Sequence, residues 1–373
     1  MKNLKGITWD HPRGFNSIVA SSNLYHAHNS LVNIEWYTRS LKEFGDQPIS
    51  ELVEKFDLLM IDHPFVGEAH KYNLLVPLET MLPSSLLNKH ESLHIGHSYP
   101  SYTYEKSQYA LPIDASAQFT AFNSQMISKA SIPTTWEDYL DQLKDSKFKN
   151  SVLWPLCPTD LWCSLLTVCA QIDGGDFFEQ GFKREIVFQG IEHLKIHTSG
   201  LNPICWDSNP INALEQMKQN NFAYSPLLFG YAHYSNKSTS IQFTNPIAFN
   251  PDYPLTLLGG VGIAVSSYSP HREVLTEFLT FLFQHSSIDA YFLAGGQPSL
   301  KEVWKNNAYN ESTHDFFLNT SKSMENTYIR PKKPGFHRFQ KEASELFHAQ
   351  YRSVSTKNMV SLLANLYTKH VHD

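Results

Sequence analysis

The tripeptide Asp-His-Pro occurs twice in the N-terminal part of the sequence, beginning at Asp10 and at Asp62, each time directly after an apolar segment. A carboxylate at a loop tip can accept hydrogen bonds from hydroxyl or ammonium groups, and the proline stiffens the loop so that little order is lost on binding. Trp9 could offer a flat face to a sugar ring or a cation. We therefore predict that a small polar ligand is bound by Trp9, Asp10, Asp62 and His63. The alternative is that both aspartates cap the helices that follow them.

The segments around these loops alternate between strand-like and helix-like patterns, which is typical of βα units around a largely parallel sheet. We expect strands at residues 4–9, 32–37 and 56–61, a helix over 16–28, and a short helix begun by Asp46 and Pro48. Ligands of open parallel sheets bind beyond the carboxyl ends of the strands. Both loops follow such an end, so we add His11 and Arg13 of the first loop to the residues expected to bind the ligand.

Two extended segments look like connections between lobes. Residues 102–123 read as strand, proline, strand, with a break expected at Pro112, and Asp114 and Ser116 follow on one face of the second part. Asp114 is either part of the ligand site or a solvated acid at the hinge. Residues 255–265, interrupted by glycines, precede a helix expected over 273–283. We expect this segment to be the connection by which the chain returns to the first lobe.

The region between these connections contains clear helix signals. Thr135 followed by Asp138 is a capping-box pattern, and an apolar helix over 161–170 is closed by Gly174. Four cysteines fall in the same region, with spacings that match neither a CxxC redox pair nor a zinc ribbon. We interpret them as buried packing residues, and we expect no metal and no cofactor.

Length and charge narrow the class of protein. A chain of 373 residues exceeds what one core usually supports, so two lobes are expected. The formal charge of -6 comes without a basic stripe, which argues against a nucleic-acid partner. No apolar run is long enough to span a membrane. The N-terminal residues lack the apolar core of an export signal, so the chain as written reads as cytoplasmic, or as extracytoplasmic if a signal was removed.

Three stretches, residues 109–139, 259–298 and 328–336, resemble bacterial extracellular solute-binding protein family 1, the sugar and oligosaccharide receptors of ABC importers. They occur in the family's order. The resemblance implies an α/β, type II periplasmic-binding-protein-like fold with two lobes, each a mixed, mostly parallel sheet flanked by helices. It places residues 1–113 and 256–305 in the N-terminal lobe and 114–255 and 306–373 in the C-terminal lobe, with a hinge and a ligand cleft between them. It also implies a monomer that could partner ABC membrane subunits.

The same resemblance places further loops on the second wall of the expected cleft. These loops contribute Trp154, Asp160, Trp162, Tyr224 and Tyr231 to the candidate site. Gln297, in the stretch that resembles the return to the first lobe, and Arg330, in the stretch that resembles the C-terminal approach to the cleft, complete it. Each tryptophan could equally be a core residue, because it buries a large area. The glycines before Gln297 could equally close a helix.

Three functions remain open from the sequence. The first is a solute-binding protein that closes on its ligand, for which the acidic first wall favours a sugar, polyol or amine over an anion, with a metal ion third. The second is an enzyme on the same fold that uses aspartate and histidine as acid and base, although no nucleophile elbow, P-loop or HExxH motif occurs. The third is a cytosolic metabolite sensor.

Overall fold

The computed structural model describes residues 1–371 apart from 176 and 179–180, and it divides into two compact units. Unit 1 consists of Met1–Ala115, Gly260–Val303 and Lys332–His337, and unit 2 of Ser116–Gly259, Trp304–Pro331 and Arg338–Asp373. The units differ most from the expected lobes at Lys332–His337, which the resemblance placed in the C-terminal lobe and which belongs to unit 1. Residues 114–115, 256–259 and 304–305 also fall in the other unit than expected.

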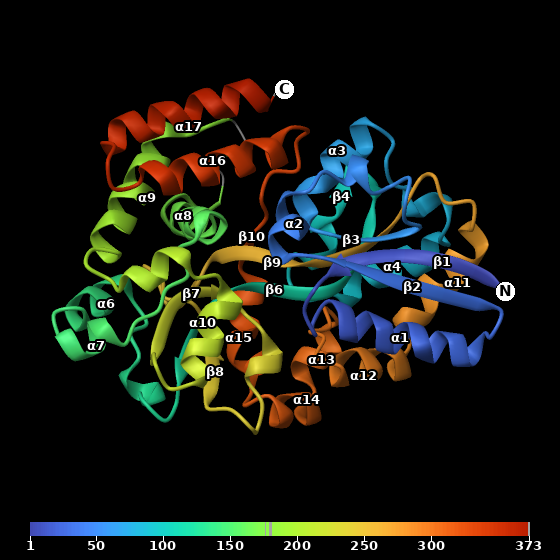
Figure 1. Ribbon diagram of the computed structural model, residues 1–373, viewed down its shortest axis with the longest axis horizontal. Helices are drawn as coiled ribbons and strands as arrows, with labels where there is room; N and C mark the ends of the chain where they lie inside the picture. The colour runs from blue at the N-terminus through green and yellow to red at the C-terminus, as the bar shows by residue number, and fades with distance from the viewer. Residues whose placement is uncertain (176, 179–180, 372–373) are drawn as a thin grey trace. The chain divides into compact units, whose positions relative to one another are not determined.

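The sheet of unit 1 has the strand order β2-β1-β3-β9 (Figure 1). β1 (Lys2–Trp9) pairs in parallel with β2 (Val32–Arg39) and with β3 (Leu58–Ile61), and β9 (Thr256–Val265) runs antiparallel to β3. The helix α1 (Phe15–His28) connects β1 to β2, which is the crossover that a parallel pair needs. The three strands and the helix expected in this region are confirmed.

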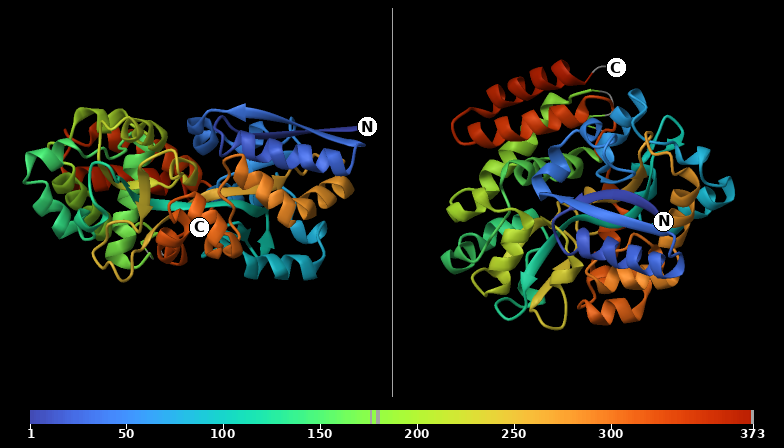
Figure 2. Two further views of the ribbon diagram at one scale, coloured as in Figure 1. Left: turned by 90° about the horizontal axis from the view of Figure 1, so that it is seen from below. Right: turned by 45° about the vertical axis from the view of Figure 1, so that its right-hand side comes forward.

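Alternate side chains of these strands point into two hydrophobic cores. Leu58 and Met60 of β3 belong to one core, and Leu59 and Ile61 belong to the other. The helices that cover the first core are α1, α11 (Arg272–Leu282) and α12 (His285–Leu293). In both views of Figure 2 the blue α1 lies beside orange helices, and α1 contacts α12. The second core is covered by η1 (Ile49–Glu51) and α3 (Val66–Lys71).

The short helix expected to begin at Asp46 ends there instead. α2 (Leu41–Asp46) begins after Ser40, whose side chain accepts from the backbone N–H of Glu43 while the Glu43 carboxylate accepts from the backbone of Ser40. This capping box sets the start of the helix. Pro48 precedes only the short turn η1.

β6 (Ala110–Asn123) is one continuous strand that leads from unit 1 into unit 2, so the expected break at Pro112 is wrong. Pro112 has no N–H to donate, but its carbonyl accepts a hydrogen bond of 2.6 Å from Ser299 Oγ. The segment after α12 continues this pairing, because the backbone N–H of Ala115 donates to the carbonyl of Gln297 at 3.1 Å. A proline is tolerated in a strand where the ladder needs only its carbonyl.

In unit 2 the pairing along β6 is antiparallel, where the sequence led us to expect mostly parallel strands. β6 pairs with β7 (Tyr224–Phe229) and with β8 (Ile241–Thr244), whereas β10 (Thr327–Tyr328) runs parallel to its neighbour, β9. The sheet is therefore mixed. The chain first enters this unit on β6 and first leaves it on β9, and it returns for Trp304–Pro331 and Arg338–Asp373, so the unit is not a series of βα repeats.

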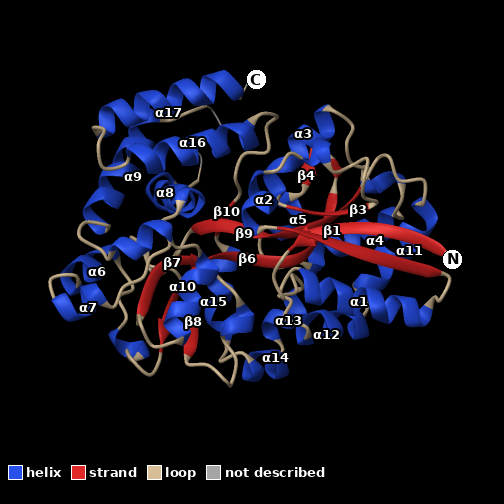
Figure 3. Ribbon diagram, in the orientation of Figure 1, coloured by secondary structure: helices blue, strands red, loops and turns tan. Residues whose placement is uncertain are grey.

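The expected helix ends in unit 2 are confirmed. α6 (Trp136–Gln142) begins at the capping box of Thr135 and Asp138, and α8 (Pro158–Asp173) ends at Gly174, whose φ of 75° is left-handed. α8 packs on α9 (Arg184–His197), which packs on α17 (Thr356–His370) among the helices drawn blue in Figure 3. The cysteines lie in this unit as free thiols, three buried and Cys157 half-buried.

No helix in the described part of the chain has the length and apolarity to cross a membrane. The remaining elements are short connectors and helices. They are η2 (His63–Phe65), η3 (Leu78–Thr80), α4 (Ser84–Leu93), α5 (Ser98–Ser101), β4 (Thr103–Tyr104), β5 (Ser107–Gln108), η4 (Lys129–Ser131), α7 (Ser146–Asn150), η5 (Pro203–Asp207), α10 (Pro210–Lys218), η6 (Ala232–Tyr234), α13 (Lys301–Lys305), α14 (Asn307–Ser312), α15 (Phe316–Glu325) and α16 (Phe336–Gln350).

Candidate functional site

Both Asp-His-Pro loops lie at the carboxyl edge of the unit 1 sheet. β1 and β3 are parallel neighbours, with Gly6 opposite Leu58 and Ile7 opposite Leu59. The loop that begins at Asp10 and the loop that begins at Asp62 therefore leave the sheet at the same edge, as parallel order requires. This edge is the candidate site of unit 1.

Asp10 is the exposed acid of this edge. Its backbone N–H donates to the carbonyl of Arg39 at 2.8 Å, which fixes the loop to the end of β2. α1 takes Gly14 as its N-cap, without a cap bond from a side chain, so the capping alternative is wrong for Asp10. An exposed carboxylate on an anchored backbone can accept hydrogen bonds from a ligand at little cost in order.

Asp62 combines a capping role with partial exposure. Its Oδ1 accepts from the backbone N–H of His63 at 2.8 Å at the start of η2, and the same oxygen lies 3.2 Å from Nδ1 of His63. The capping alternative is therefore right for Asp62. The side chain still keeps 13% of its surface exposed, whereas that of His63 keeps 1%. His63 thus orients the Asp62 carboxylate through these contacts, and its own side chain does not face solvent.

Trp9 is a core residue, which corrects its assignment to the ligand. It is only 3% exposed, and its ring centroid lies 5.1 Å from that of Phe44. Gly14 packs on the ring so closely that a Cβ there would come within 2.4 Å of it. The indole is thereby enclosed by side chain and backbone of unit 1. His11 likewise shapes the loop, because its Nδ1 accepts from the backbone N–H of Arg13 at 3.1 Å.

Arg13 and Asp114 form a buried ion pair. Arg13 Nε donates to Asp114 Oδ2 at 2.8 Å, and a second guanidinium nitrogen donates to Oδ1. Burial raises the pKa of Asp114, and the Arg13 charge opposes that rise. Neither charge is presented to a ligand, so Asp114 is neither a third acid of the wall nor a solvated hinge acid.

Gln297 is also committed to the fold. It is fully buried, and its Nε2 donates to the carbonyl of Ala115 at 2.6 Å. The backbone carbonyl of Gln297 accepts a hydrogen bond from the backbone N–H of Ala115. The side-chain amide therefore secures the segment beside β6. Ser116, the next residue along the strand, is buried as well and donates to the carbonyl of Gly230 at 3.0 Å.

The aromatic candidates of unit 2 are core residues. Trp154 is fully buried, stacks on Trp136 at a centroid distance of 5.8 Å, and donates through Nε1 to Ser164 Oγ. Trp162 is fully buried against Phe339. These contacts decide in favour of the packing alternative for both tryptophans.

Two tyrosines of unit 2 are buried too. Tyr224 lies in the same aromatic cluster, 6.0 Å from Tyr139, and burial raises the pKa of its hydroxyl. Tyr231 is 4% exposed and meets the edge of Tyr234 at 6.2 Å. Tyr224 is thereby removed from the ligand candidates, and the assignment of Tyr231 stays a prediction.

The two charged candidates of unit 2 are buried. Asp160, in the first turn of α8, accepts a hydrogen bond of 3.0 Å from the thiol of Cys157. Burial raises the pKa of Asp160 to about 7. Arg330 is 3% exposed, and its Nη1 lies 3.4 Å from Oε1 of Gln340. Asp160 is better described as a buried structural acid, and the role of Arg330 stays a prediction.

One residue of the edge was missed in the sequence. β9 runs antiparallel to β3 with Gly262 opposite Ile61, so Gly260 lies just beyond the end of β3, where Asp62 follows. Its φ is 113°, a conformation that favours glycine, and its backbone is partly exposed. A glycine inside a strand often marks close approach by a ligand or another backbone. That signal was present as Gly259-Gly260 within an apolar segment.

The described residues contain no cluster of three or more histidines, cysteines or acids that could hold a metal ion. The edge instead offers carboxylate and backbone groups suited to hydrogen bonding. The profile of the bacterial extracellular solute-binding protein family matches residues 49–316. The chain belongs to this family. The resemblance noted in the sequence is thereby confirmed, and no curated protein sequence matches this solute-binding protein.

Solved structures with the same fold belong to solute-binding proteins of several bacteria. Maltose-bound MalE3 of T. maritima has a TM-score of 0.83 at 14% identity, with 98% of this chain and 99% of that chain covered. A ribitol complex from Agrobacterium radiobacter has a TM-score of 0.83 at 15% identity and 98% coverage of both chains. An α-D-tagatose complex from Thermotoga lettingae has a TM-score of 0.80 at 15% identity and 99% coverage of both. At such identities the likeness confirms the periplasmic-binding fold.

Proposed function

We propose that this solute-binding protein is the receptor of an ABC-type importer and that it binds a sugar or a polyol. The observation that carries the ligand class is the charge of the unit 1 edge. Asp10 and Asp62 are the acids at this edge, and the base nearest in sequence, Arg13, is neutralised by Asp114. Such an edge accepts hydrogen bonds, so hydroxyl groups suit it better than carboxylates do.

The solved relatives support the same class. Those with the fold were crystallised with maltose, ribitol and tagatose, all of which are rich in hydroxyl groups. An amine ranks second, because an ammonium group would also donate to the two acids. The burial of Trp9 does not separate the two classes, because its face would have suited a sugar ring as well as a cation.

A thermal-shift panel tests this proposal. We expect maltose, ribitol or tagatose to stabilise the protein, by about 2.7 kcal/mol at a ligand concentration 100 times the dissociation constant. Amines, dicarboxylates and divalent metals serve as the other arms. A response confined to dicarboxylates or metals would contradict the proposed class.

Location and partner follow from the proposed role. The family is extracellular by description, and we infer that the protein works outside the cytoplasmic membrane. There it would deliver its ligand to the membrane subunits of an importer. Fractionation of the native host, followed by co-purification with those subunits in detergent, tests both points. Recovery only from the cytosol would favour the metabolite-sensor alternative.

The enzyme alternative receives no support from the geometry of its own candidate residues. It needed Asp10, His11, Asp62, His63 and Asp114 to converge as acid and base groups. His11 bonds its own loop, and Asp114 is paired with Arg13. His63 is buried beneath Asp62. Incubating the stabilising solute with the protein and analysing it for products tests this alternative directly.

A further inference from the structure

The segment Lys332–His337, which we call the strap, is anchored to unit 1 at its first residue. Lys332 Nζ donates to the carbonyl of Pro100 at 2.7 Å and to that of Thr103 at 2.5 Å, at the end of α5 and in β4. Burial lowers the pKa of this amine to about 8. A lysine held by two carbonyls in a half-buried position is a specific contact and not a solvated surface charge.

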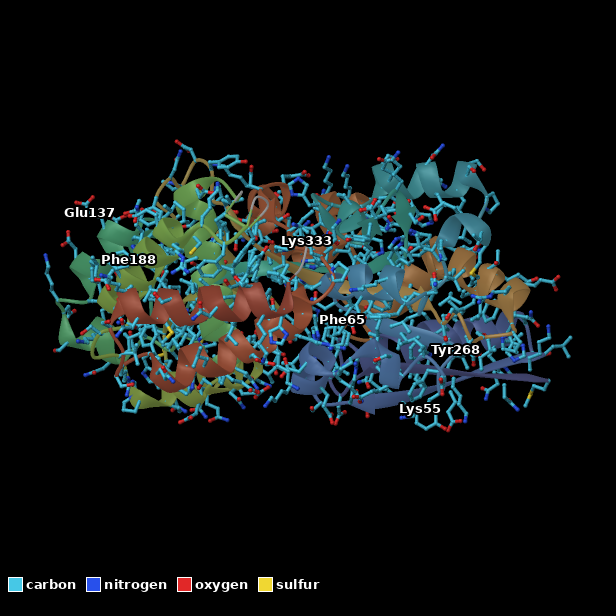
Figure 4. All side chains as sticks on the ribbon, turned by 90° about the horizontal axis from the view of Figure 1, so that it is seen from above. Lys55, Phe65, Glu137, Phe188, Tyr268 and Lys333 are labelled. Carbon is cyan, nitrogen blue, oxygen red and sulfur yellow. The ribbon has the colours of Figure 1, made fainter. Side chains whose placement is uncertain are left out.

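The last residue of the strap is anchored as well. The ring of His337 lies 4.0 Å from that of Phe65, and its Nε2 is 2.8 Å from the carbonyl of Gly45 in α2. His337 is 3% exposed and Phe65 is fully buried. Figure 4 labels Phe65, at the end of η2, and Lys333, the second residue of the strap. The strap is therefore fixed at both ends.

Between its ends the strap lies directly on α3. A Cβ added to Gly67 would come within 1.6 Å of the carbonyl oxygen of Lys332 and 3.1 Å of the backbone nitrogen of Pro334. Backbone thus rests on backbone with no room for a side chain. Phe65 and Gly67, the two residues that the strap touches here, follow Asp62 by three and five positions in the chain.

We propose that the strap is the element that presents the Asp62 loop to the ligand, and that Gly67 and Lys332 are positioning residues for binding. This inference rests on the proposed function, because it gives the strap a role only if the loop binds a ligand. Asp62 needs a fixed backbone to aim its carboxylate, since each mobile group must be ordered at a cost when the ligand binds. The strap removes that cost in advance by immobilising the residues that follow Asp62.

The first experiment measures the loop itself, with no ligand present. Hydrogen exchange is followed at the amides of His63 and Phe65 in wild type, Gly67→Ala and Gly45→Ala. Gly45 is a matched control, because it also lies in a short helix beside the strap and a Cβ there meets nothing within 4 Å. We expect about tenfold faster exchange at 63–66 in Gly67→Ala, with β3 unchanged, because local opening exposes only the loosened segment. Equal behaviour of the two variants, or faster exchange throughout unit 1, would overturn the proposal.

The second experiment adds rescue and binding. Lys332→Met removes the donors to the two carbonyls, whereas Lys332→Arg keeps a cation with N–H groups. We expect the dissociation constant for maltose, ribitol or tagatose, whichever stabilises wild type, to rise about tenfold in Lys332→Met and to recover in Lys332→Arg.

The variant Asp62→Ala distinguishes the role of the strap from the proposed ligand binding by the Asp62 loop. If Asp62→Ala weakens binding but Gly67→Ala and Lys332→Met do not, the strap has no positioning role and the proposed function stands. If Asp62→Ala leaves binding unchanged, the proposed function of this loop fails and the strap's role in binding fails with it. If no sugar or polyol stabilises wild type, the ligand class is wrong, and the exchange experiment alone decides whether the strap holds the loop.

Discussion

Arg13 and Asp114 are joined by a buried, two-pronged ion pair although they stand 101 residues apart in the sequence. Their side chains are 5% and 0% exposed. The pair connects the loop after β1 to the middle of β6, so it fixes the base of the Asp10 loop. It also pairs the two charges with each other inside the fold, where neither faces solvent.

Breaking this pair on one side should destabilise the protein strongly. Arg13→Met or Asp114→Leu leaves the partner charge buried and unpaired, which we expect to lower the free energy of unfolding by about 3–5 kcal/mol. The double variant should recover most of that loss, since it buries no charge. Urea denaturation at neutral pH measures all three. A double variant as unstable as the sum of the singles would refute this account.

The two loop acids should differ in what their removal costs. Asp10→Ala is expected to weaken ligand binding by roughly 1.5–3 kcal/mol, the value of a charge-assisted hydrogen bond, and to leave stability unchanged because Asp10 caps nothing. Asp62→Ala should weaken binding similarly and also lower stability by about 1 kcal/mol, because it loses the cap of η2. Calorimetric titration and thermal melts separate the two effects. A large drop in the melting temperature of Asp10→Ala would contradict this distinction.

The sequence predicted the features that depend on neighbours along the chain. β1, α1 and β2 follow from local periodicity, and the caps of α6 and α8 follow from residues within a turn. The environment of Trp9 could not be predicted in this way, because it depends on Phe44, a residue of α2 that lies 35 positions further along the chain. The partner of Arg13 lies on a distant strand, so no local pattern reveals it.

The same distinction separates the correct and incorrect site residues. The position of a loop at a sheet edge follows from strand order, so the placement of Asp10 and Asp62 was predictable. The burial of an aromatic side chain in unit 2 is decided by helices far along the chain, such as α16, whose Phe339 packs against Trp162. A tryptophan near a loop therefore carried little information about ligand contact.

Acid should destabilise the protein through its buried histidines. His90 Nδ1 lies 3.1 Å from His94 Nε2, and His94 Nδ1 lies 2.8 Å from Ser299 Oγ, all in buried positions of unit 1. Burial lowers the pKa of His90 from 6.5 to about 4 and lowers that of His94 well below its ordinary value. Both are neutral when folded, so the unfolded chain takes up protons first as the pH falls.

The stability contributed by this histidine pair is complete above pH 6.5 and declines as the pH falls toward 4. For His90 the loss at pH 4 is at most roughly 3 kcal/mol, at 1.36 kcal/mol per pKa unit. The measurement is urea denaturation across this range for wild type and His90→Gln, which cannot take up the proton. We expect the variant to have the shallower dependence, and equal slopes would show that His90 does not titrate on unfolding.

Asp160 should make the protein less stable as the pH rises, which is opposite to the effect of the histidine pair. Burial raises the pKa of its carboxyl from 3.8 to about 7, so the folded protein holds a proton that the unfolded chain releases between these values. Folding is therefore penalised progressively as the pH rises from about 4, and the penalty is complete above 7. Asn in place of Asp160 stays neutral at every pH and can still accept from the Cys157 thiol. We expect Asp160→Asn to match wild type near pH 4 and to exceed it at pH 8 by up to roughly 4 kcal/mol. Ligand affinity, measured alongside, should not change, because the carboxyl is buried in unit 2. A variant that is less stable at pH 8, or that loses affinity, would show that the charged carboxylate is needed and would restore Asp160 to the ligand site.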